Sequence, residues 1–155
     1  MVKGEDKKLM QFYPANKKYR VKARFEKKEN SEWFQMNTSA NTKRQYRVYG
    51  ILKFKIRDTL LTLHVYQSQD LLSSKDYWNY LFLPFTDKTT GFDTYGGGRY
   101  IDLIMTDIHG NSCVIDFNKA YNPYCAYAAG YHCPIPPAEN DLTITMMAGE
   151  KNYLK

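Results

Sequence analysis

A run of glycines followed by an arginine, Gly96-Gly97-Gly98-Arg99, is the part of the sequence best suited to binding an anion. Glycine can adopt positive φ angles that turn backbone N–H groups toward an anion, and an arginine can hold two of its oxygens. Neither common nucleotide motif fits, since a dinucleotide fingerprint needs glycine where Ile101 stands and a P-loop needs Gly-Lys-Ser/Thr. The alternative is a glycine bulge that begins a strand, with Arg99 paired to a buried carboxylate such as Asp116 or Glu139.

A second group of polar residues, Asp116, Asn118, Tyr121 and Asn122, lies where a strand is expected to end. A carboxylate and two amides there could hold a metal or a polar ligand. An EF-hand is excluded, because Tyr121 stands where that loop needs glycine. The alternative, which we favour, is that the two asparagines hydrogen-bond the backbone of their own loop. We expect neither a metal nor another cofactor.

The sequence contains 3 cysteines, Cys113, Cys125 and Cys133, so at most one disulfide can form within the chain. Cys125 and Cys133 lie close together in the sequence and are the pair most able to meet. A zinc site that uses His132 is the rival, but the spacing matches no C-x-x-C pattern. Whether these cysteines form a disulfide or remain thiols stays open.

Cys125 could instead be a nucleophile. His132 or His64 would act as its base, and Glu139 or Asn140 would orient that base. A carboxylate hydrolase using Asp116 and Glu139 is a further form of the enzyme hypothesis. Spacing alone does not bring these groups together, and a free cysteine is often only a small buried side chain. We therefore lean against an enzyme.

The elements that must position these residues are strands, because apolar and polar residues alternate along much of the chain. In 46–57 we place Tyr46, Val48, Leu52, Phe54 and Ile56 in one phase, with Gly50 marking a bend or bulge. Turns at 57–59 and 109–111 predict two hairpins. A short helical turn at 73–76 is also considered. The strands expected are 19–25, 32–38, 46–57, 61–65, 79–85, 100–106, 112–117 and 142–146.

This pattern predicts an all-β fold, an antiparallel meander that closes into a barrel or a two-sheet sandwich. We favour closure, because it removes exposed sheet edges. Two long ordered loops, 86–99 and 118–141, interrupt the meander, and such loops on a rigid sheet often carry sites. Pro134, Pro136 and Pro137 predict a rigid strap over the sheet that delivers Glu139 and Asn140.

Length and composition predict one domain over residues 1–155, with residues 1–8 disordered or foreign to the native protein. At 155 residues and 43% hydrophobic content the chain can build one core. Aromatic residues make up 15%, which excludes a disordered or coiled-coil chain. No apolar run is long enough to span a membrane.

The charge is unevenly distributed along the chain. Residues 1–57 carry 16 Lys and Arg against 5 Asp and Glu, whereas the remainder carries 6 against 11. A basic half could bind nucleic acid or an anionic surface. In that case aromatic residues would stack on bases, namely Tyr19, Phe25, Trp33 and Tyr46. The cations alternate with apolar residues, so we favour solvated outer strand faces and do not expect nucleic-acid binding.

Several segments together resemble the domain-of-unknown-function family numbered 1684. They are LFLPFTDKTTGFDTYGGGRYIDL, DFNKAYNPYCAY, CPIPPAEN and AGEK, with a looser fit at FYPANKKYRV and YGILKF. The resemblance implies a bacterial or archaeal protein without an established activity. Relatives of this kind often carry an export or lipoprotein signal upstream, which implies a location in the cell envelope; the alternative is the cytoplasm. The resemblance suggests no substrate and no oligomeric state.

The sequence therefore favours a non-enzymatic binding domain. Its two long loops would form a polar, tyrosine-rich pocket for a small polar or anionic ligand. A hydrolase is the first alternative, and binding of nucleic acid or an anionic surface is the second. The residues expected to bind the ligand are Tyr95, Arg99, Asp116, Asn118, Tyr121, Asn122, Cys125, Glu139 and Asn140.

Overall fold

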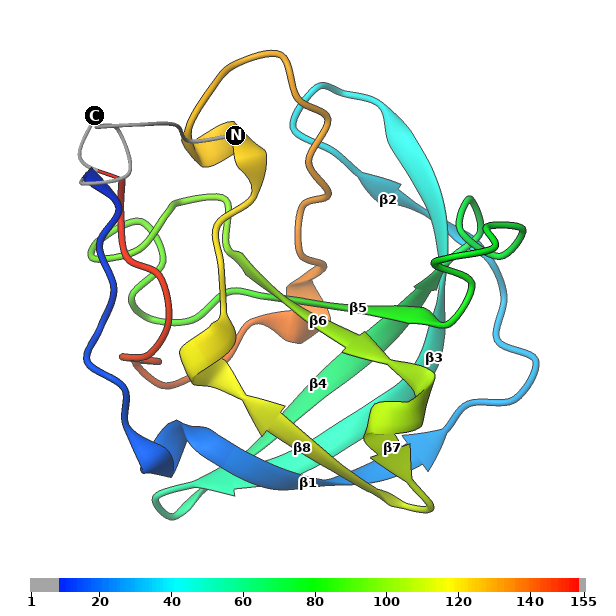
Figure 1. The fold of residues 1–155 in the computed structure, drawn as a ribbon, viewed down its shortest axis with the longest axis horizontal. Helices are drawn as coiled ribbons and strands as arrows, with labels where there is room; N and C mark the ends of the chain where they lie inside the picture. Colours follow the sequence, from blue (N-terminus) through cyan, green and yellow to red (C-terminus); the bar gives the residue numbers. More distant parts are fainter. Residues whose placement is uncertain (1–8, 154–155) are drawn as a thin grey trace.

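The protein is built on one antiparallel sheet, described by a computed structural model that covers residues 9–153 (Figure 1). The expectation for residues 1–8 lies outside these residues. The sheet has 8 strands in the order β6-β5-β4-β3-β1-β8-β7, and β2 pairs with β3. Their bounds are β1 Arg20–Lys27, β2 Phe34–Asn37, β3 Lys43–Ile56, β4 Thr59–Ser68, β5 Tyr80–Phe85, β6 Arg99–Ile104, β7 Ile108–His109 and β8 Ser112–Asp116.

The all-β fold and both hairpins are confirmed. β3 and β4 pair from Ile56↔Thr59 upward, and Arg57 turns the chain with a positive φ of 55°. β7 and β8 pair around the turn at Gly110, which also has a positive φ. Both reversals are tight because the chain takes up left-handed backbone angles at the turn.

Gly50 is a β-bulge, as predicted, and its effect on β3 is larger than the sequence indicated. The pairing with β4 shifts register between Val48 and Gly50. A Cβ on Gly50 would lie 2.2 Å from Cε1 of Phe25, so the close approach of β1 requires glycine. One extra residue in a strand turns the following side chains to the opposite face. The single phase expected for 46–56 was therefore wrong: Tyr46 and Val48 face one side, and Leu52, Phe54 and Ile56 face the other.

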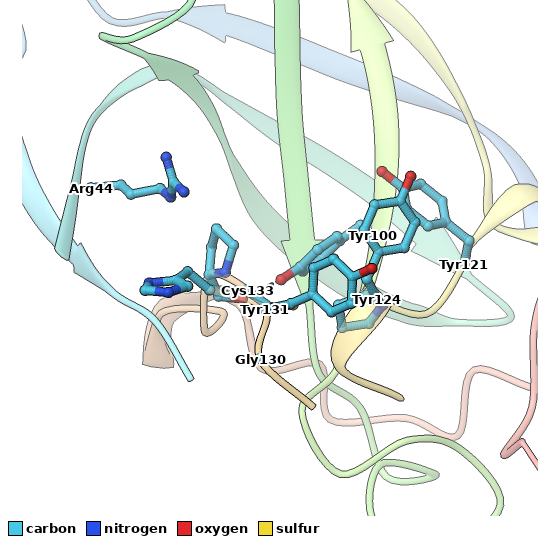
Figure 2. Close-up of a pocket in the computed structure, with 10 residues that line it drawn as sticks. Arg44, Tyr100, Tyr121, Tyr124, Gly130, Tyr131 and Cys133 are labelled. Atoms are coloured by element: carbon cyan, nitrogen blue, oxygen red, sulfur yellow. Dashed lines mark hydrogen bonds between the residues drawn. The ribbon is translucent and has the colours of Figure 1, made fainter. Parts of the chain in front are cut away.

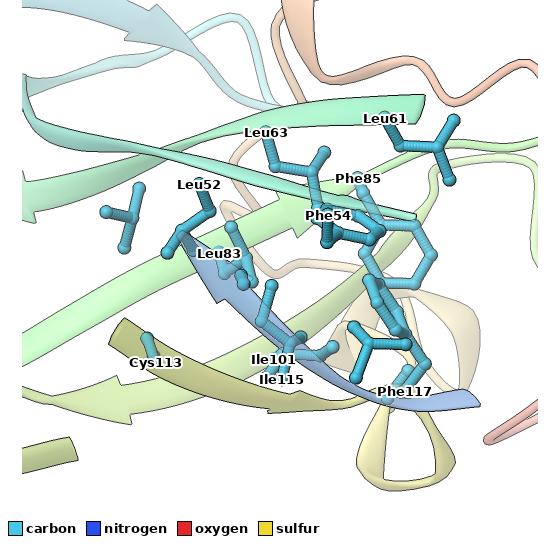
Figure 3. Close-up of a cluster of buried hydrophobic side chains, with 14 of the residues drawn as sticks. Leu52, Phe54, Leu61, Leu63, Leu83, Phe85, Ile101, Cys113, Ile115 and Phe117 are labelled. Carbon is cyan, nitrogen blue, oxygen red and sulfur yellow. The ribbon is translucent and has the colours of Figure 1, made fainter. Parts of the chain in front are cut away.

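The two faces of the sheet carry different hydrophobic clusters. The larger cluster fills the inner, concave side and is dominated by aliphatic side chains and phenylalanines (Figure 3). The outer cluster contains Met36, Tyr46, Tyr66, Phe82 and Tyr100, with Tyr80 and Tyr121 packed against it. The inner cluster forms the core of the domain. The outer cluster is a tyrosine-rich layer on which the long loops rest.

The sheet does not close into a barrel, contrary to the favoured topology. Its two ends are β6 and β7, and within residues 9–153 no ladder joins them. The chain leaves β6 through a 3-10 turn, Met105–Asp107, and returns at once as β7. A hollow of about 340 Å³ separates Asp102 of β6 from Val114 and Asp116 of β8. Because of this hollow, no strand of the described chain pairs with β6 on the side that faces β8. The sheet folds over itself as in a sandwich.

The strand expected at 142–146 is not a strand of the sheet. Its alternating burial is as predicted, with Leu142 and Met146 buried and Thr143 exposed. Its hydrogen bonds go to the first long loop instead: Leu142 N–H donates to the carbonyl of Thr86 at 2.8 Å. The segment therefore ties a loop down. Residues 73–76 form turns, and in the part of the chain that the structure describes there is no α-helix and no helix able to cross a membrane.

Candidate functional site: a tyrosine-lined pocket

A pocket of about 420 Å³ lies on the outer side of the sheet (Figure 2). A volume of this size suits a small ligand. β3 and β6 contribute one residue each, and the loop from 118 to 134 forms the remaining wall. The lining residues are Arg44, Tyr100, Tyr121, Pro123, Tyr124, Gly130, Tyr131, His132, Cys133 and Pro134.

Two tyrosines, the buried Tyr100 and the half-buried Tyr121, form the fixed back of the pocket. The rings of Tyr100 and Tyr121 meet edge to face, with centroids 5.9 Å apart. Their backbones also pair, because each N–H donates to the carbonyl of the other residue at 2.9 and 3.0 Å. The hydroxyl of Tyr100 donates to the carbonyl of Pro134, and that of Tyr121 to Oδ1 of Asp102 at 2.6 Å. Backbone and hydroxyl are thus both anchored, so this wall is preorganised.

Burial raises the pKa of both phenols. For Tyr100 desolvation is the main cause, and neighbouring phenols add to it. For Tyr121 desolvation again comes first, followed by the hydrogen bond to Asp102. A raised pKa keeps a phenol neutral at ordinary pH. This wall therefore presents aromatic faces and neutral hydroxyls to a ligand, and no charge.

The open rim of the pocket consists of Tyr124 and Tyr131. Their ring centroids lie 5.4 Å apart, and the side chains are 54% and 38% exposed. A disulfide between Cys125 and Cys133, with Cα atoms 6.4 Å apart, closes the loop that carries both rings. Ser39 lies 3.2 Å from Sγ of Cys125 and ties that loop to the end of β2. The rim is thus held from several sides.

Among the described residues, the charged side chain that lines the pocket is Arg44. It reaches the pocket from β3 and is held at 3.4 Å from Asp70 on the surface. The imidazole of His132 also lines the pocket, with Nδ1 3.0 Å from Oγ1 of Thr42. No carboxylate is among the lining residues that the structure describes. An aromatic pocket with a basic group at its mouth suits a flat or apolar molecule that carries a negative charge.

The loops expected to converge do so, but around a buried network separate from the pocket. Arg99 is 0% exposed, and Nη2 donates to Oδ2 of Asp87 at 2.9 Å. The same guanidinium donates to the carbonyls of Met146, Ala148 and Glu150. Its partner is therefore Asp87, and not Asp116 or Glu139. These bonds join the glycine turn to the C-terminal segment.

Gly98 shows why the glycine run is needed at this point. It has a φ of +85°, and a Cβ there would lie 2.7 Å from the carbonyl oxygen of Phe85 and 2.8 Å from Cγ of Pro136. Its N–H donates to the carbonyl of Tyr95 at 3.1 Å, within the same turn. The glycine run thus packs tightly against β5 and the proline strap. Tyr95 does not line the pocket.

Asn122 belongs to the same buried network as Arg99. Its N–H donates to Oε1 of Glu150 at 2.9 Å, and the Tyr127 hydroxyl donates to the other oxygen of that carboxylate. Glu150 is 1% exposed. Arg99 and Asn122 therefore meet through a common partner, at the closed end of the inner core and away from the pocket.

Asp116 makes an Asx-type turn, but the alternative favoured from the sequence is wrong: the side-chain amides of Asn118 and Asn122 donate to the carbonyls of Asn16 and Lys151, outside their own loop. Oδ1 of Asp116 accepts from the N–H and the side-chain amide of Asn118 at 3.0 and 2.9 Å. Asn118 in turn accepts from the N–H of Asn16 at 3.0 Å. Both side chains thus hold the chain where β8 ends.

The proline strap delivers Glu139 and Asn140 to β4. The hydroxyl of Tyr66 donates to Oε2 of Glu139 at 2.7 Å, and Nδ1 of His64 lies 3.8 Å from that oxygen. Asn140 is buried, and its amide donates to the carbonyls of His64 and Pro84. Asn140 is therefore a clamp between β4 and β5, and Glu139 caps the outer tyrosine layer.

The groups of the hydrolase hypotheses are not assembled. The Sγ of Cys125 is bonded to Cys133, and a disulfide sulfur is not a free thiolate nucleophile. Asp116 and Glu139 have separate hydrogen-bond partners: Asn118 in the turn after β8, and Tyr66 in β4. Within residues 9–153 no group of His, Cys, Asp and Glu side chains is arranged to hold a metal ion.

Of the expected ligand-binding residues, Tyr121 lines the pocket and Cys125 supports it through the disulfide. The sequence reasoning missed several lining residues. Tyr124, Tyr131 and His132 lie within the second long loop, where the density of aromatic residues was the available signal. Tyr100 follows Arg99 in β6 and points to the other face. Arg44 reaches the pocket only through the folding of β3.

A comparison with protein families matches residues 7–151 to the family described as Protein of unknown function (DUF1684). The chain belongs to this family. Among solved structures, this DUF1684 protein is similar to an uncharacterized protein of Haloarcula marismortui studied by NMR in solution, with 34% sequence identity and a TM-score of 0.73. The similarity covers 94% of this chain and 77% of that one. A comparison with curated proteins found no match.

Proposed function

We propose that this DUF1684 protein is a non-enzymatic binding domain whose tyrosine-lined pocket takes a small anionic ligand with a flat or apolar body. The observation that carries the proposal is the pairing of aromatic walls with a basic group at the mouth. Tyr100, Tyr121, Tyr124 and Tyr131 supply the walls, and Arg44 supplies the positive charge.

Binding, as opposed to catalysis, is supported by the way the site is held. The Tyr100 and Tyr121 hydroxyls donate to acceptors inside the protein, so their protons are committed to structure. A catalytic group needs a titratable side chain poised near the working pH. Burial raises the pKa of both phenols further above that range. A rigid aromatic wall lowers the entropy cost of binding a flat molecule.

The test uses anilinonaphthalene sulfonate, an aromatic anion whose fluorescence rises in apolar sites. We expect saturable binding by the folded protein, weakened about three- to tenfold by Tyr124→Ala, because an aromatic pair contributes about 0.5–1.5 kcal/mol. Tyr77→Ala is the matched control, since Tyr77 is 61% exposed and lies outside the pocket. Equal affinity in both variants, or no saturable binding by the wild type, would overturn the proposal.

The charge requirement is tested separately. Arg44→Gln should weaken the sulfonate dye and leave its neutral analogue, N-phenylnaphthylamine, unaffected. Lys75→Gln removes an equal charge from the β4–β5 connection and serves as the control. If Arg44→Gln binds both dyes more weakly, Arg44 supports the shape of the pocket and does not recognise the anion.

We also propose that the protein resides in an oxidising compartment such as the cell envelope. The Cys125–Cys133 disulfide supports this location, because reducing cytoplasms disfavour structural disulfides. Denaturing the protein directly from cells in the presence of a maleimide reagent should label Cys113 alone. Labelling of all 3 cysteines would contradict the proposal.

A further inference from the structure

A basic face lies on the outer side of β1 and β3, below the bulge at Gly50. On β1 the exposed residues alternate with the buried Val21 and Ala23, and on β3 with Phe54 and Ile56. The exposed positions of 20–24 and 53–57 are all cations. The face is bounded by two acids, Glu26 further along β1 and Asp58 in the turn. The cations of the basic face are Arg20, Lys22, Arg24, Lys53, Lys55 and Arg57.

The arrangement of these cations is unfavourable for the isolated protein. Arg24 and Lys53 are directly opposite in the β1–β3 ladder. Like charges in cross-strand positions destabilise a sheet. Among residues 9–153, no ion pair involves any cation of the basic face. Arg20, by contrast, stands opposite Asp116 in the β1–β8 ladder. The other cations of the two strands face no acid in their ladders and are open to an external polyanion.

The basic face is bordered by aliphatic side chains. Leu60 stands opposite Lys55 in β4 and is 66% exposed. Val114 stands opposite Lys22 in β8 and is 40% exposed. Cations flanked by exposed aliphatic groups are typical of surfaces that rest in the headgroup region of a bilayer. Single-stranded nucleic acid would call for exposed aromatic rings instead. Of the four rings considered for stacking, Tyr19, Phe25 and Tyr46 are 2%, 7% and 7% exposed. The fourth, Trp33, is half-buried, with the guanidinium of Arg47 over its ring.

A hollow beside the basic face is of a size to admit a phosphate headgroup. It measures about 320 Å³ and lies between β1 and the β7–β8 turn, lined by Lys22, Arg24, Asn111 and Ser112. No carboxylate lines it among the described residues. We infer that the outer face of β1 and β3 docks on a bilayer rich in anionic phospholipid, held by these cations and by shallow insertion of Leu60 and Val114.

The experiment is co-sedimentation of the full chain with vesicles. Vesicles of phosphatidylglycerol and phosphatidylcholine in equal amounts should bind the protein at low salt, and vesicles of phosphatidylcholine alone should not. Added salt should release the protein, because exposed charges are screened beyond about 10 Å at 0.1 M. Failure to bind the anionic vesicles at low salt would overturn the inference.

Two variants with the same net charge separate the basic face from charge in general. Lys22→Glu/Lys53→Glu should lower the vesicle partition coefficient at least tenfold, since each cation near an anionic surface contributes about 1 kcal/mol. Lys75→Glu/Lys88→Glu, in the connections on either side of β5, should lower it much less. Equal losses would mean that net charge alone governs binding. Thermal unfolding of both variants verifies the fold.

A third variant separates a bilayer from a nucleic acid. Leu60→Ser should lower vesicle binding several-fold and leave any retention on duplex DNA unchanged, because only a bilayer receives an aliphatic side chain. Tighter binding to DNA than to anionic vesicles, with no effect of Leu60→Ser on the vesicles, would overturn the bilayer assignment in favour of nucleic acid. The dye-binding pocket lies elsewhere, so either result leaves the pocket test independent.

Discussion

Arg99 and Tyr100 are neighbours in β6, yet they belong to regions of opposite character. Arg99 turns to the inner face, where Asp87 and backbone carbonyls use its donors. Tyr100 turns to the outer face, where its ring forms a wall of the open pocket. The neighbours Tyr121 and Asn122 also point to opposite sides: Tyr121 lines the pocket, and Asn122 belongs to the buried network. Chemically promising residues therefore serve structure on one face and remain available to a ligand on the other.

The physical reason is the alternation of side chains along a strand. Adjacent residues of a strand point to opposite faces of the sheet. The inner face is closed at this end by the C-terminal segment, so polar groups there must find partners within the protein. The outer face is covered only by loops. The same loops thus create a sealed network on one side and a cavity on the other.

Of the variants that test this comparison, Arg99→Met should lower the free energy of unfolding the most. Removing the guanidinium leaves the Asp87 carboxylate, 5% exposed, without its cation. Breaking a buried pair in this way costs about 3–5 kcal/mol. Urea unfolding should show this loss, and Asp87→Asn in the same chain should recover part of it. A loss below about 1 kcal/mol would mean that the inner network is not structural.

Replacement of both disulfide cysteines, Cys125→Ser/Cys133→Ser, tests the pocket side. The bridge spans a sequence separation of 8, so its removal should lower the free energy of unfolding by about 2–3 kcal/mol. Affinity for anilinonaphthalene sulfonate should fall as well, since the loop carries Tyr124 and Tyr131. Unchanged dye affinity in a destabilised variant would show that the loop keeps its shape without the bridge.

Alkaline pH tests how tightly the inner core is sealed. Burial, helped by the charge of Asp107, raises the pKa of the Cys113 thiol from 9.0 to about 11. A raised pKa in the folded state means that the stabilisation is complete below pH 9 and is lost as pH rises toward 11. By about pH 10 the loss should be roughly 1.4 kcal/mol relative to neutral pH. Urea unfolding across this range measures it.

Cys113→Ala provides the control for the pH series. In that variant the free energy of unfolding should not fall from pH 9 onward through the thiol. The fall caused by ionisation of buried tyrosines at higher pH should remain. Burial raises the pKa of Tyr46 from 10.0 to about 12, so its stabilisation is lost between these values. A wild type and a Cys113→Ala variant with the same pH profile would show that solvent reaches the thiol.

The smallest effect on stability should come from Tyr124→Ala. Tyr124 is 54% exposed at the rim, so its truncation should change the free energy of unfolding by less than about 0.5 kcal/mol. The same variant should lose dye affinity. Urea unfolding beside dye titration therefore distinguishes a rim residue from a structural one, and a large loss of stability would place Tyr124 with the inner network.

Much of the fold could be predicted because its signals are local. The alternation of 19–25 and 61–65 and the two tight turns were sufficient to predict strands and hairpins there. The strand expected at 142–146 failed because alternating burial also occurs in a segment that crosses a loop without joining a ladder. The barrel was wrong because closure depends on how far β6 lies from β8, which no local pattern records.

The candidate site was predicted less completely. The sequence pointed to the second long loop, and Tyr121 of that loop lines the proposed pocket. Arg99 looked like a ligand because glycines precede it, but its partner Asp87 lies in another turn of the same loop and shares a hydrogen-bond network with Met146. The alternative of a buried carboxylate was right in kind, but which acid pairs with Arg99 depends on how the loop folds.

The sequence by itself determined the strands, the turns, the glycine bulge and the family, since each depends on neighbouring residues or on a pattern of residue types. The tertiary structure decided which polar residues hydrogen-bond within the protein and which line the pocket. Gly50 shows the reason: one inserted residue moved Tyr46 and Val48 away from the core and onto the tyrosine layer. Which face a side chain occupies depends on the register between strands, and strand register is a property of the assembled sheet.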